Sequence, residues 1–278
     1  MPVIAMNQEM GSKGKDVAAL LAQQLGLALV RHEVVDHVAE KMRARKSLIR
    51  RIMEGKAGLI EGMATDKKSL AIYTAEEVFE LALKGNVVIR GWGATYLLRQ
   101  VPHIPCVRVC APMEVRVKWM MERLETDDEE LVRQELRRSD AAHIANMQQR
   151  FGVTWGDPLI YDLVLNTERL SVETCVEEIK LLLQRPEFQE TPESRTKLQN
   201  LALEARVRAA LKSDPDTDDI NITIEADNGR VKLLGIVLHD SERGAAEKTA
   251  RAVPGVTAVE NQLKVMSRAR IFTSEKYD

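Results

Sequence analysis

Glycine and lysine residues that could bind a phosphate lie together near the start of the chain, in Gly11-Ser12-Lys13-Gly14-Lys15-Asp16. The glycines let backbone N–H groups approach an anion closely, and the lysines add full positive charges. Residues 2–6 form an apolar run typical of a short buried strand, and apolar residues over 17–25 recur at helical spacing. A strand, a glycine turn and a helix N-terminus together predict a nucleotide-phosphate site in which Lys15 contacts the β- and γ-phosphates.

Two positions depart from the usual form of such a site. Aligned on Gly14 and Lys15, the pattern G-x-x-x-x-G-K-[ST] would have glycine at Glu9 and a hydroxyl residue at Asp16. Glu9 brings negative charge toward a phosphate site, whereas the Asp16 carboxylate can hold Mg²⁺ or the waters around it. The alternative interpretation is an ordinary tight turn before a helix, with Lys13 and Lys15 in solvent.

The composition is typical of a globular protein and predicts a cytoplasmic one. The 278 residues suffice for two domains, 45% are hydrophobic, and the formal net charge of −2 does not point to nucleic acid as a partner. The three cysteines suit a reducing compartment, and neither they nor the five histidines show metal-ligand spacing. The start of the chain lacks a signal-peptide pattern, and no run of about eighteen apolar residues predicts a membrane span.

Strand-like and helix-like segments alternate over residues 1–185, which predicts an α/β domain with a mostly parallel sheet flanked by helices. A polar, glycine-containing stretch at 58–68 predicts a mobile loop. Further strands are expected at 27–30, 87–89, 104–111 and 163–165, and helices at 74–84, 113–124, 129–150 and 171–183.

The character of the sequence changes at residues 186–200, where prolines and polar residues predict a linker. Residues 201–267 then read as a helix, two strands, a second helix and a last strand. Asn228-Gly229 between the two strands tolerates the positive φ angles of a type I′ turn, so we expect a hairpin there. A small α+β domain of α-β-β-α-β order is therefore expected, followed by a tail at 268–278.

Several segments of the first 185 residues resemble, in the right order, the cytidylate kinase-like family, a branch of the P-loop nucleoside-monophosphate kinases. The resemblance implies a P-loop sheet with a helical lid, ATP and Mg²⁺ as cofactors, and phosphoryl transfer to a nucleoside monophosphate such as CMP or to a small acceptor. An acidic residue in the place of Asp16 is usual in this family. The matching segments are Met10–Asp16, Val88–Ala94, Ala111–Arg116, Trp155–Pro158 and Tyr161–Thr167.

The resemblance also suggests where the acceptor binds. The basic segment 43–56, with Arg43 and Arg50, lies where the family holds its monophosphate acceptor. Arg90 stands where a second magnesium carboxylate is expected, and we count it with the acceptor-binding set. Arginine suits phosphate because its guanidinium group can donate two parallel hydrogen bonds to the phosphate oxygens. A run of charge on a helix is also typical of a solvated face, and that alternative stays open.

Two arginines of the helix expected at 113–124 are candidates for neutralising the transferred phosphoryl group. Arg116 and Arg123 lie seven residues apart, on one face of that helix. They either reach the phosphates or pair with Glu122 and Glu125.

The lid helix of the family carries an Asp-x-x-Arg pattern, and this chain keeps only half of it. Asp140 is present, but His143 occupies the place of the arginine. His143 can replace that arginine only when it is protonated. Arg137 or Arg138, about one turn away, is the other candidate. Asp140 either orients a lid arginine or caps a helix.

These departures leave two main hypotheses, and a purely structural interaction protein is a third possibility. The first is a phosphotransferase. Lys15 and the intact closing segment at 155–167 favour retained nucleotide binding, which this function requires. The second is a catalytically weak nucleotide sensor, which the residues at Glu9, Arg31, Arg90 and His143 favour. Arg31 belongs to this set because the family usually has an aspartate in its place, just after the second strand.

Residues 201–266 resemble a BON domain, which implies binding of a lipid surface or a partner protein. The resemblance lies in Val207–Leu211, Gly229–Gly235 and Val253–Asn261. From Asn200 onward there are 12 Lys and Arg against 13 Asp and Glu, so this module carries a charge of about −1. Such a charge disfavours simple attraction to anionic lipid and favours a protein-contact or ligand-sensing role.

Overall fold

The computed structural model describes residues 1–30, 32–53, 66–91 and 93–266 of the chain. The chain divides into two compact units, Met1–Gln199 and Asn200–Asp278, which are described separately below. No helix among the described residues is long and apolar enough to cross a membrane.

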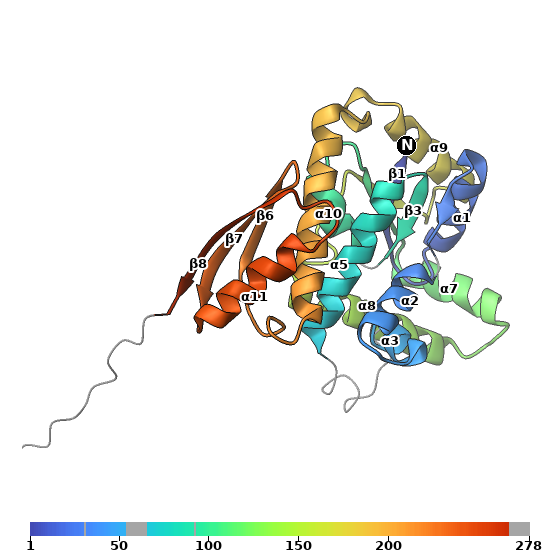
Figure 1. Ribbon diagram of the computed structural model, residues 1–278. Coiled ribbons are helices and arrows are strands. Elements are labelled where there is room, and N and C mark those ends of the chain that lie inside the picture. Colours follow the sequence, from blue (N-terminus) through green and yellow to red (C-terminus); the bar gives the residue numbers. More distant parts are fainter. Residues whose placement is uncertain (31, 54–65, 92, 267–278) are drawn as a thin grey trace, which may run out of the picture. The chain divides into compact units, whose positions relative to one another are not determined.

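The first unit is built on a sheet of five parallel strands (Figure 1). The chain runs from the central strand β1 to one side of the sheet and later crosses to the other side. This reversal creates a switch point at the carboxyl ends of the strands, where open α/β sheets bind their ligands. In sheet order the strands are β2 (Ala28–Leu29), β3 (Val87–Arg90), β1 (Val3–Gln8), β4 (Cys106–Cys110) and β5 (Leu163–Asn166).

Helices cover both faces of this sheet because its central strands are apolar on both sides. Alternate residues of β1, such as Ile4 and Met6, share one core with α1 (Gly14–Leu25) and α9 (Val172–Leu183). On the other side of the sheet α6 (Ala94–Leu97) packs on β1 and α5 (Lys67–Lys84) packs on β3. The predicted α/β architecture is therefore confirmed.

The remaining helices of the first unit form two groups. After β2 come α2 (Glu33–Lys41) and α3 (Lys46–Met53), of which α2 packs against α5. After β4 come α7 (Met113–Leu124) and α8 (Glu129–Phe151), which pack on each other through a small apolar core. Of the loop predicted at 58–68, residues 58–65 lie outside the described residues, and Lys67 already belongs to α5. Short 3₁₀ turns are η1 (Leu98–Gln100), η2 (Pro158–Ile160) and η3 (Pro186–Phe188).

Residues 186–200, predicted as a linker, are instead mostly helical. They contain η3 and the first turns of α10 (Pro192–Ser213), and the division between the two units falls inside this helix. Thr191 and Ser194 each accept a hydrogen bond through their side-chain hydroxyl from the other's backbone N–H, at 3.2 and 2.9 Å. With Pro192 in the first turn, this reciprocal pair is a favourable helix start. The polar composition of the segment misled the prediction, because polar residues also cap a helix and occupy its solvent-exposed side.

The second unit is a three-stranded sheet with helices on one face. Its strands β6 (Thr223–Asp227), β7 (Arg230–Val237) and β8 (Ala258–Val265) lie in that order, with β6–β7 antiparallel and β7–β8 parallel. The sheet shares one core with α11 (Asp240–Arg251) and the second half of α10. Asn228 and Gly229 have φ angles of 48° and 85°, so the predicted type I′ turn is present.

Candidate functional site

A cavity of about 400 Å³ lies beside the glycine loop, where β1 ends and α1 begins. The loop, the end of β3, α7 and α8 all contribute to its wall, so segments far apart in the sequence meet there. The structure places seven of the predicted site residues on this wall: Gly11, Lys13, Gly14, Lys15, Arg90, Arg123 and His143.

The glycine loop is held in shape from inside. Ser12 is fully buried, and its hydroxyl donates to the carbonyl oxygens of Glu9 and Val109, at 2.8 and 3.1 Å. Lys13 occupies the N-cap position of α1 with φ of 57°, and Gly11 has φ of 83°. Ser12 was expected among the cofactor-binding residues of the loop, and its side chain stabilises the loop.

Gly14 lies where the first turn of α1 presses against the end of β1. A Cβ atom there would lie 2.6 Å from Gln8 Cβ and 3.2 Å from Val109 Cβ, closer than such atoms tolerate. We expect Gly14→Ala to lower the free energy of unfolding by about 1–3 kcal/mol, as overpacking commonly does. Urea denaturation of the wild type and the variant measures this difference in unfolding free energy. Gly156→Ala is the control, because no heavy atom lies within 4 Å of its added Cβ; equal losses for both variants would contradict the close approach at Gly14.

Two buried polar atoms on the cavity wall are left without partners. Gln8 Oε1 and Arg90 Nε have no hydrogen-bond partner among the described residues. Burial lowers the pKa of Arg90 below its ordinary value, because desolvation disfavours the charged guanidinium, and no ion pair joins Arg90 to a carboxylate of the described residues. An unneutralised guanidinium beside two lysines and a helix N-terminus fits an anionic ligand such as a phosphate.

The donor set for Mg²⁺ centres on Asp16. This carboxylate lies in the first turn of α1, and Arg123 Nη1 lies 3.8 Å from Asp16 Oδ1. No group of three or more His, Cys, Asp or Glu residues in the described part of the chain could hold a metal ion. Mg²⁺ is commonly held by one or two carboxylates with waters and substrate phosphates, and one carboxylate beside a phosphate loop fits that mode.

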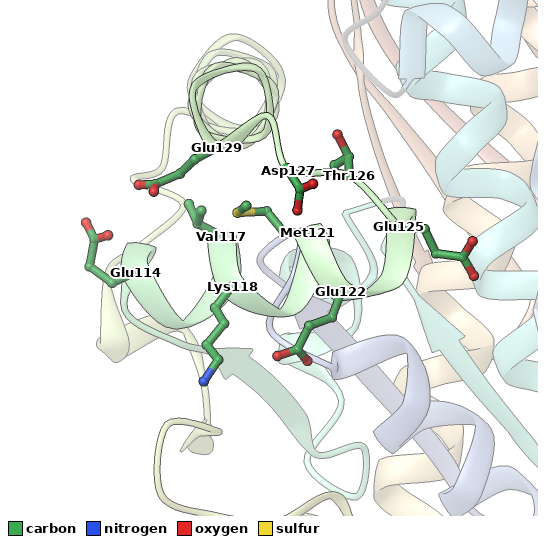
Figure 2. Close-up of a pocket in the computed structure, with 9 residues that line it drawn as sticks. All are labelled: Glu114, Val117, Lys118, Met121, Glu122, Glu125, Thr126, Asp127 and Glu129. Atoms are coloured by element: carbon green, nitrogen blue, oxygen red, sulfur yellow. The ribbon is translucent and has the colours of Figure 1, made fainter.

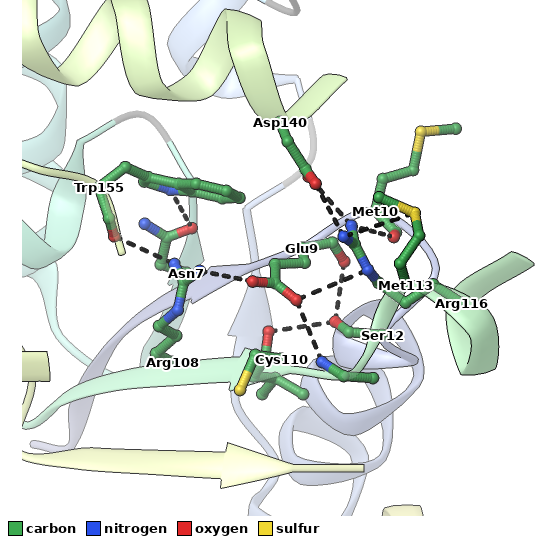
Figure 3. Close-up of polar contacts among 12 residues, drawn as sticks. Asn7, Glu9, Met10, Ser12, Arg108, Cys110, Met113, Arg116, Asp140 and Trp155 are labelled. Atoms are coloured by element: carbon green, nitrogen blue, oxygen red, sulfur yellow. Dashed lines mark hydrogen bonds and ion pairs between the residues drawn. The ribbon is translucent and has the colours of Figure 1, made fainter. Parts of the chain in front are cut away.

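Arg116 and Arg123, expected on one helix face, have different surroundings. Arg123 is half-exposed at the cavity rim, with its guanidinium 4.8 Å from the centroid of the Trp119 ring. Arg116 is 5% exposed and does not line the cavity. Its guanidinium donates to both Asp140 carboxylate oxygens, Nη1 to Oδ1 at 3.0 Å and Nη2 to Oδ2 at 2.8 Å (Figure 3). Burial opposes the charge of Arg116, but the hydrogen bonds and charge of Asp140 raise its pKa.

His143 lies on the cavity wall but is packed against an aromatic ring. Its imidazole stacks on Trp155, with ring centroids 5.0 Å apart and an interplanar angle of 15°. Trp155 is buried, and its Nε1 donates to Asn7 Oδ1 at 3.0 Å. Trp155 therefore packs as a core residue.

Three further predicted residues are exposed and do not line the cavity. Arg43 lies between α2 and α3, Arg50 lies on α3, and Arg137 lies on α8. The Arg50 guanidinium approaches His32 Nδ1, at 3.5 Å. Arg31, which the sequence analysis named among the departures from the family pattern, lies outside the described residues.

The sequence analysis missed several wall residues. Met53, Trp119, Met120 and Ser139 line the cavity without any local motif. Asn7 and Gln8 carried a usable signal, because they are polar residues at the carboxyl end of an otherwise apolar strand.

A second hollow, of about 560 Å³, lies at α7 and the turn that joins it to α8 (Figure 2). Five carboxylates surround it, against one lysine, so it would repel a phosphate. None of the predicted site residues lines it. Its acidic residues are Glu114, Glu122, Glu125, Asp127 and Glu129.

Comparisons with known proteins match each of the two units to a family. Residues 3–169 match the cytidylate kinase-like family, and residues 200–267 match the BON domain. A cytidylate kinase from Staphylothermus marinus is 29% identical over 123 residues, which cover 44% of this chain and 68% of that protein. A cytidylate kinase from Ignicoccus hospitalis is 29% identical over 191 residues, which cover 66% of this chain and 99% of that protein.

The fold has a counterpart among solved structures. An uncharacterized protein from Eubacterium ventriosum superimposes with a TM-score of 0.53 and 21% identity, over 66% of this chain and 100% of that one. This likeness concerns the fold. Since the family match spans residues 3–169, more than half of the 278 residues, the chain belongs to the cytidylate kinase-like family.

Proposed function

We propose that the protein is a cytoplasmic ATP-dependent phosphotransferase that moves the γ-phosphoryl group to a nucleoside monophosphate of the CMP type or to a small acceptor. The observation that carries this proposal is the grouping of Lys13, Lys15, Arg90 and Arg123 around one cavity at the glycine loop. Four cations on one wall suit a ligand with several phosphate charges. The cytidylate kinases from Staphylothermus marinus and Ignicoccus hospitalis support the choice of acceptor class.

Each residue has a defined part in the proposed reaction. Lys15 and the N–H groups of the loop hold the donor phosphates, and Arg90 holds the acceptor phosphate. Arg123 neutralises charge on the group in transfer, an effect that commonly supplies several kcal/mol of the barrier reduction. Asp16 would hold Mg²⁺, which supplies further neutralisation of phosphate charge when bound. No general base is needed, because alignment and charge neutralisation dominate phosphoryl transfer.

The structure changes the part proposed for Arg116. Its guanidinium is committed to Asp140 and buried, so we assign it to positioning of the lid helix α8 rather than to contact with phosphate. Asp140 was expected either to orient a lid arginine or to cap a helix. The arginine that it pairs with, Arg116, belongs to α7 and not to the lid helix.

The alternative function is a catalytically weak nucleotide sensor whose BON domain binds a partner protein or a lipid surface. One observation favours it: the lid position His143 stacks on Trp155 instead of carrying a permanent charge into the cavity. A sensor needs the phosphate site but not the lid cation.

A panel of nucleoside monophosphates and small metabolites, each with ATP and Mg²⁺, tests the proposal through ADP formation. We expect turnover with at least one pyrimidine monophosphate, above the ATP hydrolysis seen without acceptor. Arg90→Gln should raise the KM for that acceptor more than the KM for ATP. ATP binding without ADP formation from any acceptor would contradict the phosphotransferase and support the sensor.

A further inference from the structure

Glu9, the residue that departs from the usual glycine-loop pattern, has both carboxylate oxygens occupied by hydrogen-bond donors or a cation (Figure 3). Oε1 accepts from Arg108 Nη2 at 2.7 Å, and Oε2 accepts from the Ala111 backbone N–H at 3.1 Å. Arg116 Nε lies 3.7 Å from Oε2. The side chains of both arginines are almost fully buried, at 6% and 5% exposed. The negative charge of Glu9 is therefore neutralised inside the protein.

Arg108 continues this contact chain to the closing segment. Its Nη1 donates to the Trp155 carbonyl oxygen at 3.1 Å, and its guanidinium lies 4.3 Å from the centroid of the Trp155 ring. Trp155 in turn stacks on His143 of α8. Glu9 is thus connected to the lid helix through Arg108 and Trp155.

Arg116 continues the chain on the other side. Besides its two bonds to Asp140, its Nη1 donates to the Met10 carbonyl oxygen of the glycine loop at 3.3 Å. Asp140 and His143 lie three residues apart on α8, on the same helix face. The two routes from Glu9 therefore meet on one turn of the lid helix.

We propose that Glu9 is a positioning residue that couples the glycine loop to the lid helix α8 and to the closing segment at Trp155. The inference rests on the proposed function in placing the nucleotide at the glycine loop. The Glu9 carboxylate accepts a hydrogen bond from Arg108 and lies 3.7 Å from Arg116 Nε, so it stands between two buried cations on neighbouring elements. Among the described residues, no other carboxylate forms an ion pair with Arg108. Without it, Arg108 becomes a buried cation with no carboxylate partner, and the contacts that join the glycine loop to Trp155 are weakened.

This role and a simple charge effect have opposite consequences for nucleotide binding. Removing a negative charge beside a phosphate site strengthens ATP binding if charge alone matters. If Glu9 positions the loop and the lid, its removal weakens ATP binding, because the loop and α8 no longer share one arrangement.

The test is Glu9→Gln in the full chain, which keeps the size of the side chain and removes its charge. Amide hydrogen exchange without nucleotide should increase in α8 and in residues 153–157 together. Calorimetry with ATP and Mg²⁺ should show weaker binding, on the order of 10-fold. Glu114→Gln is the control: it removes a carboxylate that pairs with Arg133 of the same lid helix but makes no recorded contact with the glycine loop. It should leave ATP affinity and exchange at 153–157 unchanged.

Each other outcome is decisive. Tighter ATP binding by Glu9→Gln with unchanged exchange overturns the proposal, and so does a lower melting temperature with affinity and exchange unaltered. If the wild-type chain does not bind ATP, the proposed function fails, whereas the exchange comparison still decides the coupling. If Glu9→Gln does not fold, Asp140→Asn tests the far end of the chain of contacts. Exchange in residues 9–14 should then rise, and unchanged exchange there overturns the proposal.

Discussion

Lys15→Ala should abolish most of the affinity for ATP and Mg²⁺, with a loss of about 2–4 kcal/mol, or about 30- to 700-fold in Kd. The reason is that Lys15 lines the cavity beside the N-terminus of α1, where a bound nucleotide would bury its charge against phosphate oxygens. Truncating one partner of a desolvated charge pair leaves the other without compensation. Isothermal titration calorimetry measures the change directly.

The matched control for this experiment is Lys118→Ala. Lys118 belongs to α7 and lines the acidic hollow rather than the cavity at the glycine loop. Its removal changes the net charge by the same amount. It should nevertheless leave the Kd for ATP within about twofold, since Lys118 is exposed outside the cavity and water and ions screen its charge. Equal ATP affinity in wild type and Lys15→Ala would show that the glycine turn is structural and that the lysine is solvated.

Arg116→Met should destabilise the first unit by about 3–5 kcal/mol, the usual cost of removing one partner of a buried ion pair. Methionine keeps most of the volume but leaves the Asp140 carboxylate without the guanidinium that pairs with it, and removes one of the two arginines beside Glu9. The three tryptophans, Trp92, Trp119 and Trp155, all belong to the first unit, so fluorescence during urea denaturation reports on that unit.

Arg133→Met is the control for the ion pair of Arg116. Arg133 of α8 also joins α7 to α8, with contacts of 2.6 Å to Glu114 and Glu129. These contacts are shorter than the 2.8 Å contact between Arg116 and Asp140. These two carboxylates are 74% and 58% exposed, and water and ions screen such a pair. The loss of unfolding free energy in Arg133→Met should therefore be much smaller than in Arg116→Met. If both variants lose the same stability, burial is not what makes Arg116 important.

The buried network also explains a feature that looked unfavourable in the sequence. Glu9 was expected to bring negative charge toward the phosphates, and this counted against nucleotide binding. In the folded chain Arg108 and Arg116 neutralise it, so the cavity keeps its cationic wall. Glu9 therefore no longer argues for the sensor hypothesis. His143 still does, because its side chain is stacked on Trp155.

The linker shows where composition misleads. Prolines and polar residues over 186–200 predicted a linker, but Thr191-Pro192 followed by Ser194 is a local helix-start pattern, and α10 begins there. Proline at the first helical position costs nothing, because the N–H that it lacks would have no partner in the helix. The signal was present in the sequence and was outweighed by the overall polarity of the segment.

The sequence by itself determined the strands, most of the helices and the glycine loop, because these depend on contiguous residues whose spacing and chemistry can be read directly. Only the tertiary structure decided which cations face the cavity. Arg116 and Arg123 share a helix, yet Arg116 is buried against Asp140 and Arg123 lies at the rim. Glu9 and Arg108 are 99 positions apart and meet because β1 and β4 are neighbours in the sheet. Strand neighbours are chosen by the packing of the whole unit, so no local pattern could reveal that pair.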